Sequence, residues 1–367
     1  MALNVLRRYT SGGRLVHSFG RFSSSAKSKS QYGMAFDIDG VLVRGPKVLP
    51  RARESLKKLV DANVPFVFVT NGGGCTEHEK AQELTKLLGV EVVRSMVVLC
   101  HSPMRTLVPE LSSKRVLVLG SKARIIAKED LGLRDMVTPE EFAVEWPNLF
   151  PFTGEKYYVK RRFPERLPGE GKEPRPVSAI LVLHDPLDWL LEAQVVTDVL
   201  KGGNPPGSGD GPQTPMYVSN PDLLYAAAYS EPRFGAGAFA DTVSMLYAKR
   251  FGAGEPVIGE FGKPTAATFD FARNTLEGRA EAMGLAIKNG GRPLDRIYMV
   301  GDNPSGDIRG ANNAGAPWIS NLVRTGLFRG DGGGDNDETN PAHFVHDDVG
   351  ACVDFAMRRE AEVFAAE

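Results

Sequence analysis

Two aspartates, Asp37 and Asp39, directly follow the apolar run Met34-Ala35-Phe36 and precede Gly40. Because side chains alternate along a strand, residues two apart point the same way, here at the carboxyl end of a predicted strand. Ligands of open α/β sheets bind at that end. Two carboxylates this close repel each other unless a cation intervenes. The spacing therefore predicts a metal-dependent site at residues 37 and 39.

Other polar residues follow apolar runs later in the chain. Thr70 and Asn71 end the run PFVFVTN, Lys263 precedes a predicted helix, and Asp302 follows IYMVG with Asp307 five residues on. Taken singly, each is explained as well by helix capping or by a solvated surface charge. Their joint order at the ends of predicted strands favours one shared site.

The elements that must position these residues alternate strands with helices. Strands are predicted over 33–38, 65–70, 115–119, 179–183 and 296–300. Helices are predicted over 50–62, 265–276 and 349–366, from about 307, and after Thr76, where Glu79 completes a capping box. The stretches 163–176 and 202–215 are rich in proline and glycine and are expected at the surface. This alternation predicts an α/β fold with a parallel sheet and a second domain.

Composition narrows the class of protein. The chain has 367 residues, of which 42% are hydrophobic and 24% charged, which suits one or two globular domains. No run approaches the roughly 18 to 20 apolar residues of a bilayer-spanning helix, so stable membrane insertion is not expected. Cys75, Cys100 and Cys352 are odd in number and contain no C-x-x-C pair. This argues against a disulfide framework and a thiolate zinc site.

The amino-terminal region differs in charge from the rest. The first 36 residues contain six arginines and lysines and no acid, which is typical of a mitochondrial transit peptide. We expect residues 1–32 to form that leader and the protein to reach the matrix; a disordered basic tail of a cytosolic protein is the alternative. The remainder holds 38 basic and 45 acidic residues. Without a basic face, a nucleic-acid partner is not expected.

The ordered series D-x-D-G-V, T-N, G-K-P and G-D-N-x-x-x-D resembles the four motifs of the haloacid dehalogenase superfamily, from about residue 33 to 330. The long interval between Thr70 and Lys263 is similar to subfamily IIA, whose α/β cap of the C2 type follows the second motif. Residues 217–222, YVSNPD, resemble the Asn-Pro-Asp segment of that cap. The strings HDPLDW at 184–189, RFG at 233–235 and GDNPSGDI at 301–308 resemble the mitochondrial cat-eye-syndrome critical-region-protein-5 branch.

The resemblance implies a domain division. A doubly wound, Rossmann-like core would comprise residues 33–100 and 235–345, with the cap at 101–234 and a carboxyl-terminal helix at 346–367.

It also implies a magnesium-dependent phosphatase. Asp37 would attack the phosphate to give an aspartyl-phosphate, and Asp39 would serve as general acid and base. Mg²⁺ would be bound by Asp37, the backbone carbonyl of Asp39 and Asp302, with Asn303 and Asp307 in or beside its outer shell.

The same resemblance assigns residues to the substrate, a small phosphorylated metabolite. Thr70 and Asn71 would bind the phosphoryl oxygens, and Lys263 would neutralise charge on the nucleophile and the transferred group. The residues expected to contact substrate from the cap are His184, Asp185, Asn220 and Asp222.

Two alternatives remain open. The chain could be a non-catalytic mitochondrial binding protein on the same scaffold, or a phosphotransferase or mutase that passes the phosphoryl group to another alcohol. Fungal relatives in this family imply a link to glycerophospholipid metabolism. The sequence leaves the oligomeric state undetermined.

Overall fold

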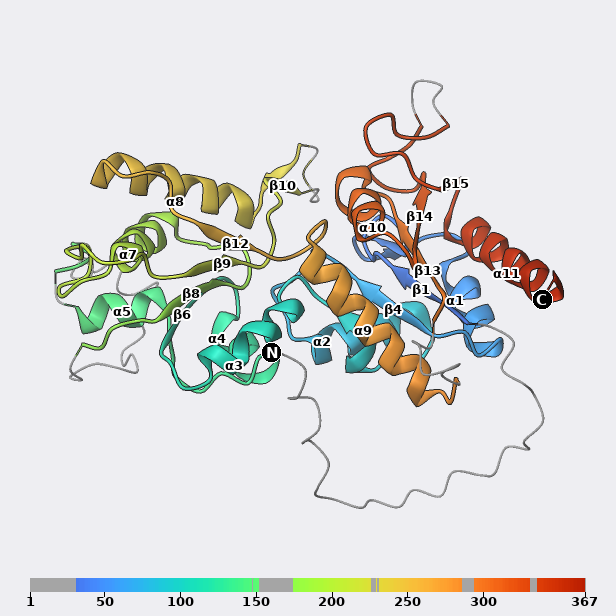
Figure 1. Cartoon of the computed structure of the whole chain (residues 1–367), viewed down its shortest axis with the longest axis horizontal. Coiled ribbons are helices and arrows are strands. Elements are labelled where there is room, and N and C mark those ends of the chain that lie inside the picture. Colours follow the sequence, from blue (N-terminus) through green and yellow to red (C-terminus); the bar gives the residue numbers. More distant parts are fainter. Residues whose placement is uncertain are drawn as a thin grey trace, which may run out of the picture.

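A computed structural model describes residues 31–146, 148–151, 174–225, 229, 231–285, 294–330 and 335–366. The expected leader falls almost wholly outside these ranges, as does most of the expected insert at 163–176. Figure 1 shows two α/β units side by side, each built around its own sheet. We call the unit that contains β1 the core unit and the other the cap unit. Within the described ranges, no helix has the length and apolar character needed to cross a membrane.

The core unit contains a six-stranded sheet in the order β15-β14-β13-β1-β4-β5, with every neighbouring pair parallel. Its strands are β1 (Tyr32–Phe36), β4 (Phe66–Val69), β5 (Val97–Val98), β13 (Arg296–Gly301), β14 (Trp318–Val323) and β15 (Phe344–His346). From β1 the chain proceeds to β4 on one side and later returns on the other side at β13. This reversal places a topological switch point at the carboxyl end of β1.

Helices cover both faces of this sheet. They are α1 (Ala52–Asp61), α2 (Glu77–Leu88), α9 (Ala266–Ala282), α10 (Arg309–Ala314) and α11 (Val349–Ala366). Strand alternation divides the side chains between two apolar clusters: Met34 and Phe36 pack with α1, α2 and α11, whereas Ala35 packs with α9 and α10. The prediction of a doubly wound parallel core with an additional domain is confirmed.

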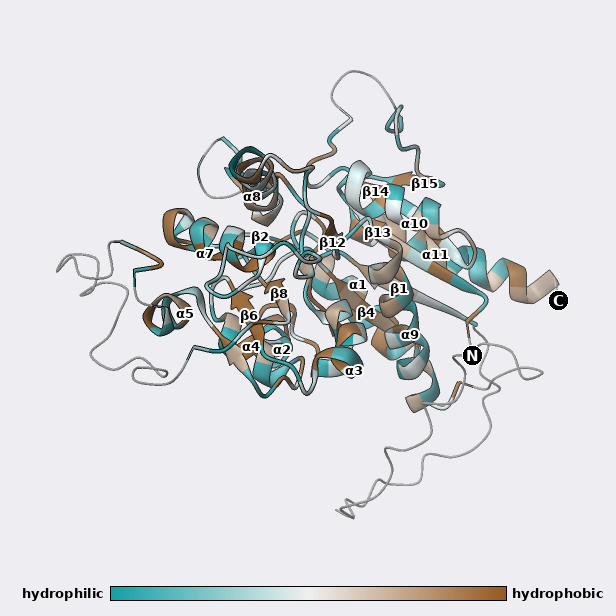
Figure 2. Ribbon diagram, turned by 60° about the vertical axis from the view of Figure 1, so that its left-hand side comes forward, coloured by the Kyte–Doolittle hydropathy of each residue, from teal (hydrophilic) through white to brown (hydrophobic). Residues whose placement is uncertain are grey.

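The cap unit contains a parallel five-stranded sheet in the order β12-β9-β8-β6-β7. Its strands are β6 (Val116–Leu119), β7 (Met136–Val137), β8 (Ala179–Val182), β9 (Met216–Val218) and β12 (Ile258–Glu260). The helices around it are α4 (Ala123–Glu129), α5 (Pro139–Glu145), α7 (Trp189–Lys201) and α8 (Ala236–Phe251). Figure 2 shows the hydrophobic character of β6 and β8, whose residues are buried.

Short elements complete the two units. Two hairpins are formed by β2 (Val43–Arg44) with β3 (Lys47–Val48), and by β10 (Leu224–Tyr225) with β11 (Arg233–Phe234). The connecting turns are η1 (Arg94–Met96), η2 (Ser102–Leu107), α3 (Val108–Leu111) and the π-helical η3 (Pro304–Ile308).

The boundaries of the two units differ in part from the expected domain limits. Strand β12 pairs with β9, and Phe239 and Val243 of α8 lie in the apolar cluster of the cap sheet. The cap sheet therefore extends past residue 234, and we propose that the chain returns to the core near Phe261. Helix α11 packs Cys352 and Val353 into the core cluster, so we assign it to the core unit.

Candidate active site

Three aspartates converge at the switch point. Asp37 follows β1, Asp302 follows β13, and Asp307 lies in η3. Because β1 and β13 are parallel and paired, their carboxyl ends are adjacent. Each aspartate contributes a carboxylate oxygen, and these oxygens all lie within 4.8 Å of one another. All three residues are buried.

A buried lysine completes this group. The Lys263 Nζ donates to Asp37 Oδ1 at 2.6 Å, to Asp307 Oδ1 at 2.6 Å and to the Val69 carbonyl at 2.8 Å. Burial acts to lower the pKa of Lys263, but the carboxylates of Asp307 and Asp37 outweigh it and raise that pKa. The lysine is therefore held as a cation. We call Asp37, Lys263, Asp302 and Asp307 the carboxylate cluster.

The cluster has more negative than positive charge. Burial raises the pKa of Asp37 well above its usual value against the opposing effect of Lys263, and Asp307 and Asp302 raise it further. Burial, reinforced by Asp307, raises the pKa of Asp302 to about 6. Converging carboxylate oxygens are the donors that hard divalent cations prefer. The residues present therefore fit Mg²⁺, whose charge would offset the burial and the repulsion that together raise these pKa values.

The chain after β14 holds Asp302 in place. The Leu327 N–H donates to Asp302 Oδ2 at 2.6 Å, and the Phe328 N–H donates to the Asp302 carbonyl at 3.0 Å. A Cβ at Gly326 would overlap the Asp302 carboxylate, so only glycine allows this approach. Sequence reasoning missed this segment, because Ser320 and Asn321 interrupt the apolar pattern of β14 and Arg324 separates that strand from Thr325-Gly326.

Thr70 and Asn71 lie beside Lys263. Thr70 is buried, and its Oγ1 accepts a hydrogen bond from the Gly72 N–H at 3.0 Å. The Asn71 side chain donates to the Lys263 carbonyl at 2.9 Å and accepts from the Lys263 N–H at 2.6 Å. This pair of hydrogen bonds joins the loop after β4 to the loop after β12. We call residues 70–74 the β4 loop.

Comparison with known protein families shows the family to which this chain belongs. A haloacid dehalogenase-like hydrolase model matches residues 34–134, and a HAD-hydrolase-like model matches residues 260–352. The chain belongs to the haloacid dehalogenase-like hydrolases. A mitochondrial hydrolase of Saccharomyces cerevisiae is 33% identical over 89% of this chain and 95% of its own length. A Schizosaccharomyces pombe protein named as a fusion of cardiolipin synthase with a mitochondrial hydrolase is 34% identical over 93% of this chain. This chain spans 56% of the fusion protein.

Solved structures share the fold of this hydrolase. A hypothetical protein from Pyrococcus horikoshii has a TM-score of 0.62 at 20% identity, covering 89% of this chain and 99% of its own. NagD from Escherichia coli has a TM-score of 0.57 at 18% identity, covering 88% and 98% respectively. NagD-like proteins form subfamily IIA, to which the sequence motifs also point.

Asp307 lies within the carboxylate cluster of the hydrolase site, and Asn303 lies beside it. The Asp307 carboxylate is itself a member of the carboxylate cluster, and its Oδ2 accepts from the Asn303 N–H at 3.1 Å. The Asn303 side chain accepts from the Ser305 N–H at 3.0 Å and the Gly306 N–H at 3.3 Å. Asn303 thus shapes the turn that carries Asp307.

Asp39 lies at the outer side of the hydrolase site. Its side chain reaches solvent, unlike that of Asp37, and it is not part of the carboxylate cluster. Protein nonetheless surrounds much of it, and this desolvation raises the pKa of Asp39 against the opposing charge of Lys80. Gly40 follows with φ +85°, and a Cβ there would come within 2.5 Å of Asp302 Oδ2. Glycine is therefore required where the chain turns past the cluster.

Three of the four expected cap residues, Asn220, Asp222 and His184, lie against the β4 loop, and Asp185 lies beside His184. Asn220 donates to the Asn71 carbonyl at 3.2 Å, and Asp222 Oδ2 accepts from Asn71 Nδ2 at 3.1 Å. His184 Nε2 lies 3.7 Å from Asp185 Oδ2, and a Cβ at Gly74 would come within 2.9 Å of that nitrogen. Burial lowers the pKa of His184. Asn220 and Asp222 therefore fix the β4 loop to the cap unit.

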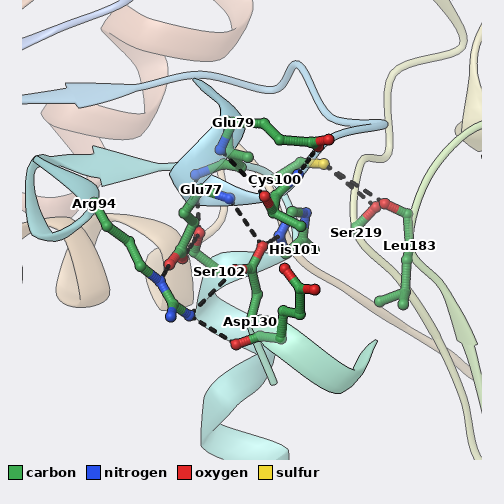
Figure 3. Close-up of polar contacts among 12 residues, drawn as sticks. Glu77, Glu79, Arg94, Cys100, His101, Ser102, Asp130, Leu183 and Ser219 are labelled. Carbon is green, nitrogen blue, oxygen red and sulfur yellow. Dashed lines mark hydrogen bonds and ion pairs between the residues drawn. The ribbon is translucent and has the colours of Figure 1, made fainter. Parts of the chain in front are cut away.

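A second buried polar group connects the two units at the amino end of α2 (Figure 3). Asp130, after α4 of the cap unit, accepts from the Glu77 N–H at 3.0 Å and contacts His101 Nε2 at 2.9 Å. Arg94 bridges Glu77 at 3.0 Å and Asp130 at 3.1 Å. Arg105 also pairs with Glu77, and both acidic residues are buried. We call Glu77, Arg94, His101, Arg105 and Asp130 the joint cluster.

Proposed function

We propose that this hydrolase cleaves phosphomonoesters with the help of Mg²⁺, through an aspartyl-phosphate on Asp37. The observation that carries this proposal is the convergence of Asp37, Asp302 and Asp307 around the Lys263 ammonium at the switch point of the core sheet. A carboxylate fixed in this way is a suitable nucleophile, because its position is set before the substrate arrives.

The reaction would take two steps. In the first, an Asp37 carboxylate oxygen bonds to phosphorus while the bond from phosphorus to the alcohol oxygen breaks, and Asp39 gives its proton to that oxygen. In the second, water attacks the same phosphorus, Asp39 takes the water proton, and inorganic phosphate leaves with Asp37 restored. The raised pKa of Asp39 favours the protonated form that the first step needs.

The other residues bind and orient the phosphoryl group. The Thr70 hydroxyl and the Asn71 N–H would donate to its oxygens, while Lys263 offsets their charge beside the nucleophile. The carboxylates of Asp37 and Asp302, with the Asp39 carbonyl, would hold Mg²⁺, and Asp307 would support it. When bound, the ion supplies positive charge that stabilises the phosphoryl oxygens in the transition state.

The names of the two relatives support a mitochondrial location for this hydrolase. Both are named as mitochondrial hydrolases, and one is fused to a cardiolipin synthase. We therefore place this hydrolase in mitochondria, with residues 1–32 as its transit peptide, and we assign it a phosphorylated substrate of glycerophospholipid metabolism.

The test is hydrolysis of p-nitrophenyl phosphate by the purified protein with Mg²⁺ and with EDTA. We expect turnover only with Mg²⁺, and a loss of at least about 10³-fold in Asp37→Asn. Asp61→Asn is the matched control, because Asp61 is exposed at the end of α1. Absence of turnover on a panel of phosphomonoesters would favour the binding-protein alternative. Phosphoryl transfer to an added alcohol in preference to water would favour the phosphotransferase.

A further inference from the structure

Large apolar side chains are exposed on one part of the cap unit. They belong to the β10–β11 hairpin, to the residue before it and to the start of α7. Their exposed fractions lie between 43% and 68%. We call this set the apolar face, and its members are Leu187, Leu190, Leu223, Leu224, Tyr225 and Phe234.

The apolar face is held together by its own contacts. Leu224 of β10 pairs directly with Phe234 of β11. The Phe234 ring lies 6.3 Å from the ring of Trp189, which stands between Leu187 and Leu190 in the sequence. Trp189 in turn packs edge-on against buried Phe239 at 5.5 Å. The Leu224–Phe234 pair and Trp189 therefore join the hairpin to the start of α7, while Leu223 and Tyr225 point to the other side of the two-stranded hairpin.

Both segments begin, in the sequence, next to residues that contact the β4 loop. Leu223 directly follows Asp222, whose carboxylate accepts a hydrogen bond from Asn71. Leu187 lies three residues after His184 in the sequence, and His184 packs against Gly74 of the β4 loop. Figure 1 shows the β10 hairpin on the side of the cap unit that faces the core unit.

The core unit adds an apolar residue beside the site. Leu327 is 63% exposed, and its own N–H binds the Asp302 carboxylate at 2.6 Å. A polar and charged centre is thus flanked on both units by exposed apolar side chains. Exposed leucines are common singly, but a cluster next to a binding site indicates a ligand with matching apolar surface.

We propose that the apolar face binds a hydrocarbon chain of the substrate, which is therefore the phosphomonoester of an amphiphile. This inference rests on the proposed function. A phosphate held at Asp37 has its ester oxygen directed away from the buried carboxylates, so the attached group must leave the site past the cap residues at its rim. A purely polar alcohol would leave the apolar face in water, whereas an alkyl chain covers it, and each buried methylene contributes up to about fourfold in affinity.

The test compares straight-chain alkyl phosphates from butyl to dodecyl phosphate with Mg²⁺, each below its critical micelle concentration. We expect kcat/KM to rise at least about tenfold from butyl to dodecyl phosphate. Phe234→Ser should flatten this gradient. The matched control is Val257→Ser, which removes a still more exposed apolar residue (82%) before β12, at the end of that strand away from Lys263. It should keep the wild-type gradient.

The outcomes separate this inference from the proposed function. If every alkyl phosphate is hydrolysed with the same kcat/KM, the inference is overturned and the proposed function stands. If none is hydrolysed, the inference and the proposed function are both overturned. A chain-length gradient that persists in both Phe234→Ser and Leu187→Ser also overturns the inference. Thermal melts show whether each variant is folded, and the second variant keeps the test valid if the first misfolds. Activity that appears only with micelles or vesicles would show that the apolar face binds a membrane instead. A dimer that Phe234→Ser dissociates without changing the gradient would show that the face binds a second copy of the chain.

Discussion

The carboxylate cluster and the joint cluster, both built on buried acids, have different balances of charge. In the joint cluster, two carboxylates face two guanidinium groups, and a histidine contacts one of the carboxylates. In the carboxylate cluster, three carboxylates face one ammonium. Burial acts to raise the pKa of Asp130, but hydrogen bonds from His101 and Glu77 outweigh it and lower that pKa. For Asp37 and Asp302 burial prevails and the pKa rises.

The difference distinguishes a structural ion network from a functional site. A buried acid with enough donors stays ionised and links the elements that it contacts. Carboxylates brought together without enough partners cost stability, and such an arrangement persists where a ligand or ion completes it. The comparison therefore supports the proposed catalytic role of the carboxylate cluster and a role of the joint cluster in attaching the cap.

The largest expected effect is that of Lys263→Met. It removes the ammonium that pairs with both Asp37 and Asp307, so we expect p-nitrophenyl phosphate hydrolysis to fall at least about 10³-fold. Loss of a buried ionic partner should also lower the free energy of unfolding by about 3 to 5 kcal/mol in EDTA. Urea denaturation with and without Mg²⁺ measures this, and added Mg²⁺ should recover part of the loss. A variant with near wild-type activity would remove Lys263 from the proposed mechanism.

Asp130→Asn tests whether the joint cluster contributes to stability rather than to catalysis. We expect a loss of about 3 kcal/mol in the free energy of unfolding, because buried His101, the Glu77 N–H and the partly exposed Arg94 lose the Asp130 carboxylate. The rate constant of hydrolysis should change less than about threefold, since the carboxylate cluster is untouched. Activity that falls as far as in Lys263→Met would contradict the division of roles between the clusters.

The pH dependence of that loss has a definite sign. The pKa of Asp130 is lower in the folded protein than its ordinary value, so its contribution to stability is complete above about pH 4 and is lost as pH falls through the lower folded value. The stability difference between wild type and Asp130→Asn should therefore be full at pH 7 and shrink below about pH 4. Denaturation series at several pH values measure it, and a constant difference would exclude the ionised carboxylate as its source.

The two clusters also differ in how far the sequence predicts them. Asp37, Thr70 and Asp302 directly follow apolar runs, and parallel pairing brings the carboxyl ends of such runs together, so their strand ends predict a shared location. The position of Asp307 within the cluster depends on the π-helical turn after Asn303, which no periodicity indicates. Gly326 was missed because its role is a close approach rather than a side-chain reaction.

The joint cluster could not be predicted from pattern. Glu77 begins a helix and Asp130 follows one, 53 residues apart, and both fit a solvated surface by composition. Their burial depends on how the cap unit packs on α2. The membership of β12 in the cap sheet was missed for a similar reason, because the pairing of β12 with β9 is a long-range contact.

The smallest expected effect is that of Lys122→Gln. Lys122 of the cap unit pairs with Glu79 of α2 at 2.9 Å, so it spans the same two units as the joint cluster, yet both side chains are nearly half exposed. Exposed ion pairs contribute little, because water and salt screen them and two long side chains must be ordered. We expect the urea midpoint to match wild type within error in 0.5 M salt and at low salt alike. A loss comparable with that of Asp130→Asn would show that charge pairing across the units, rather than burial of the pair, attaches the cap.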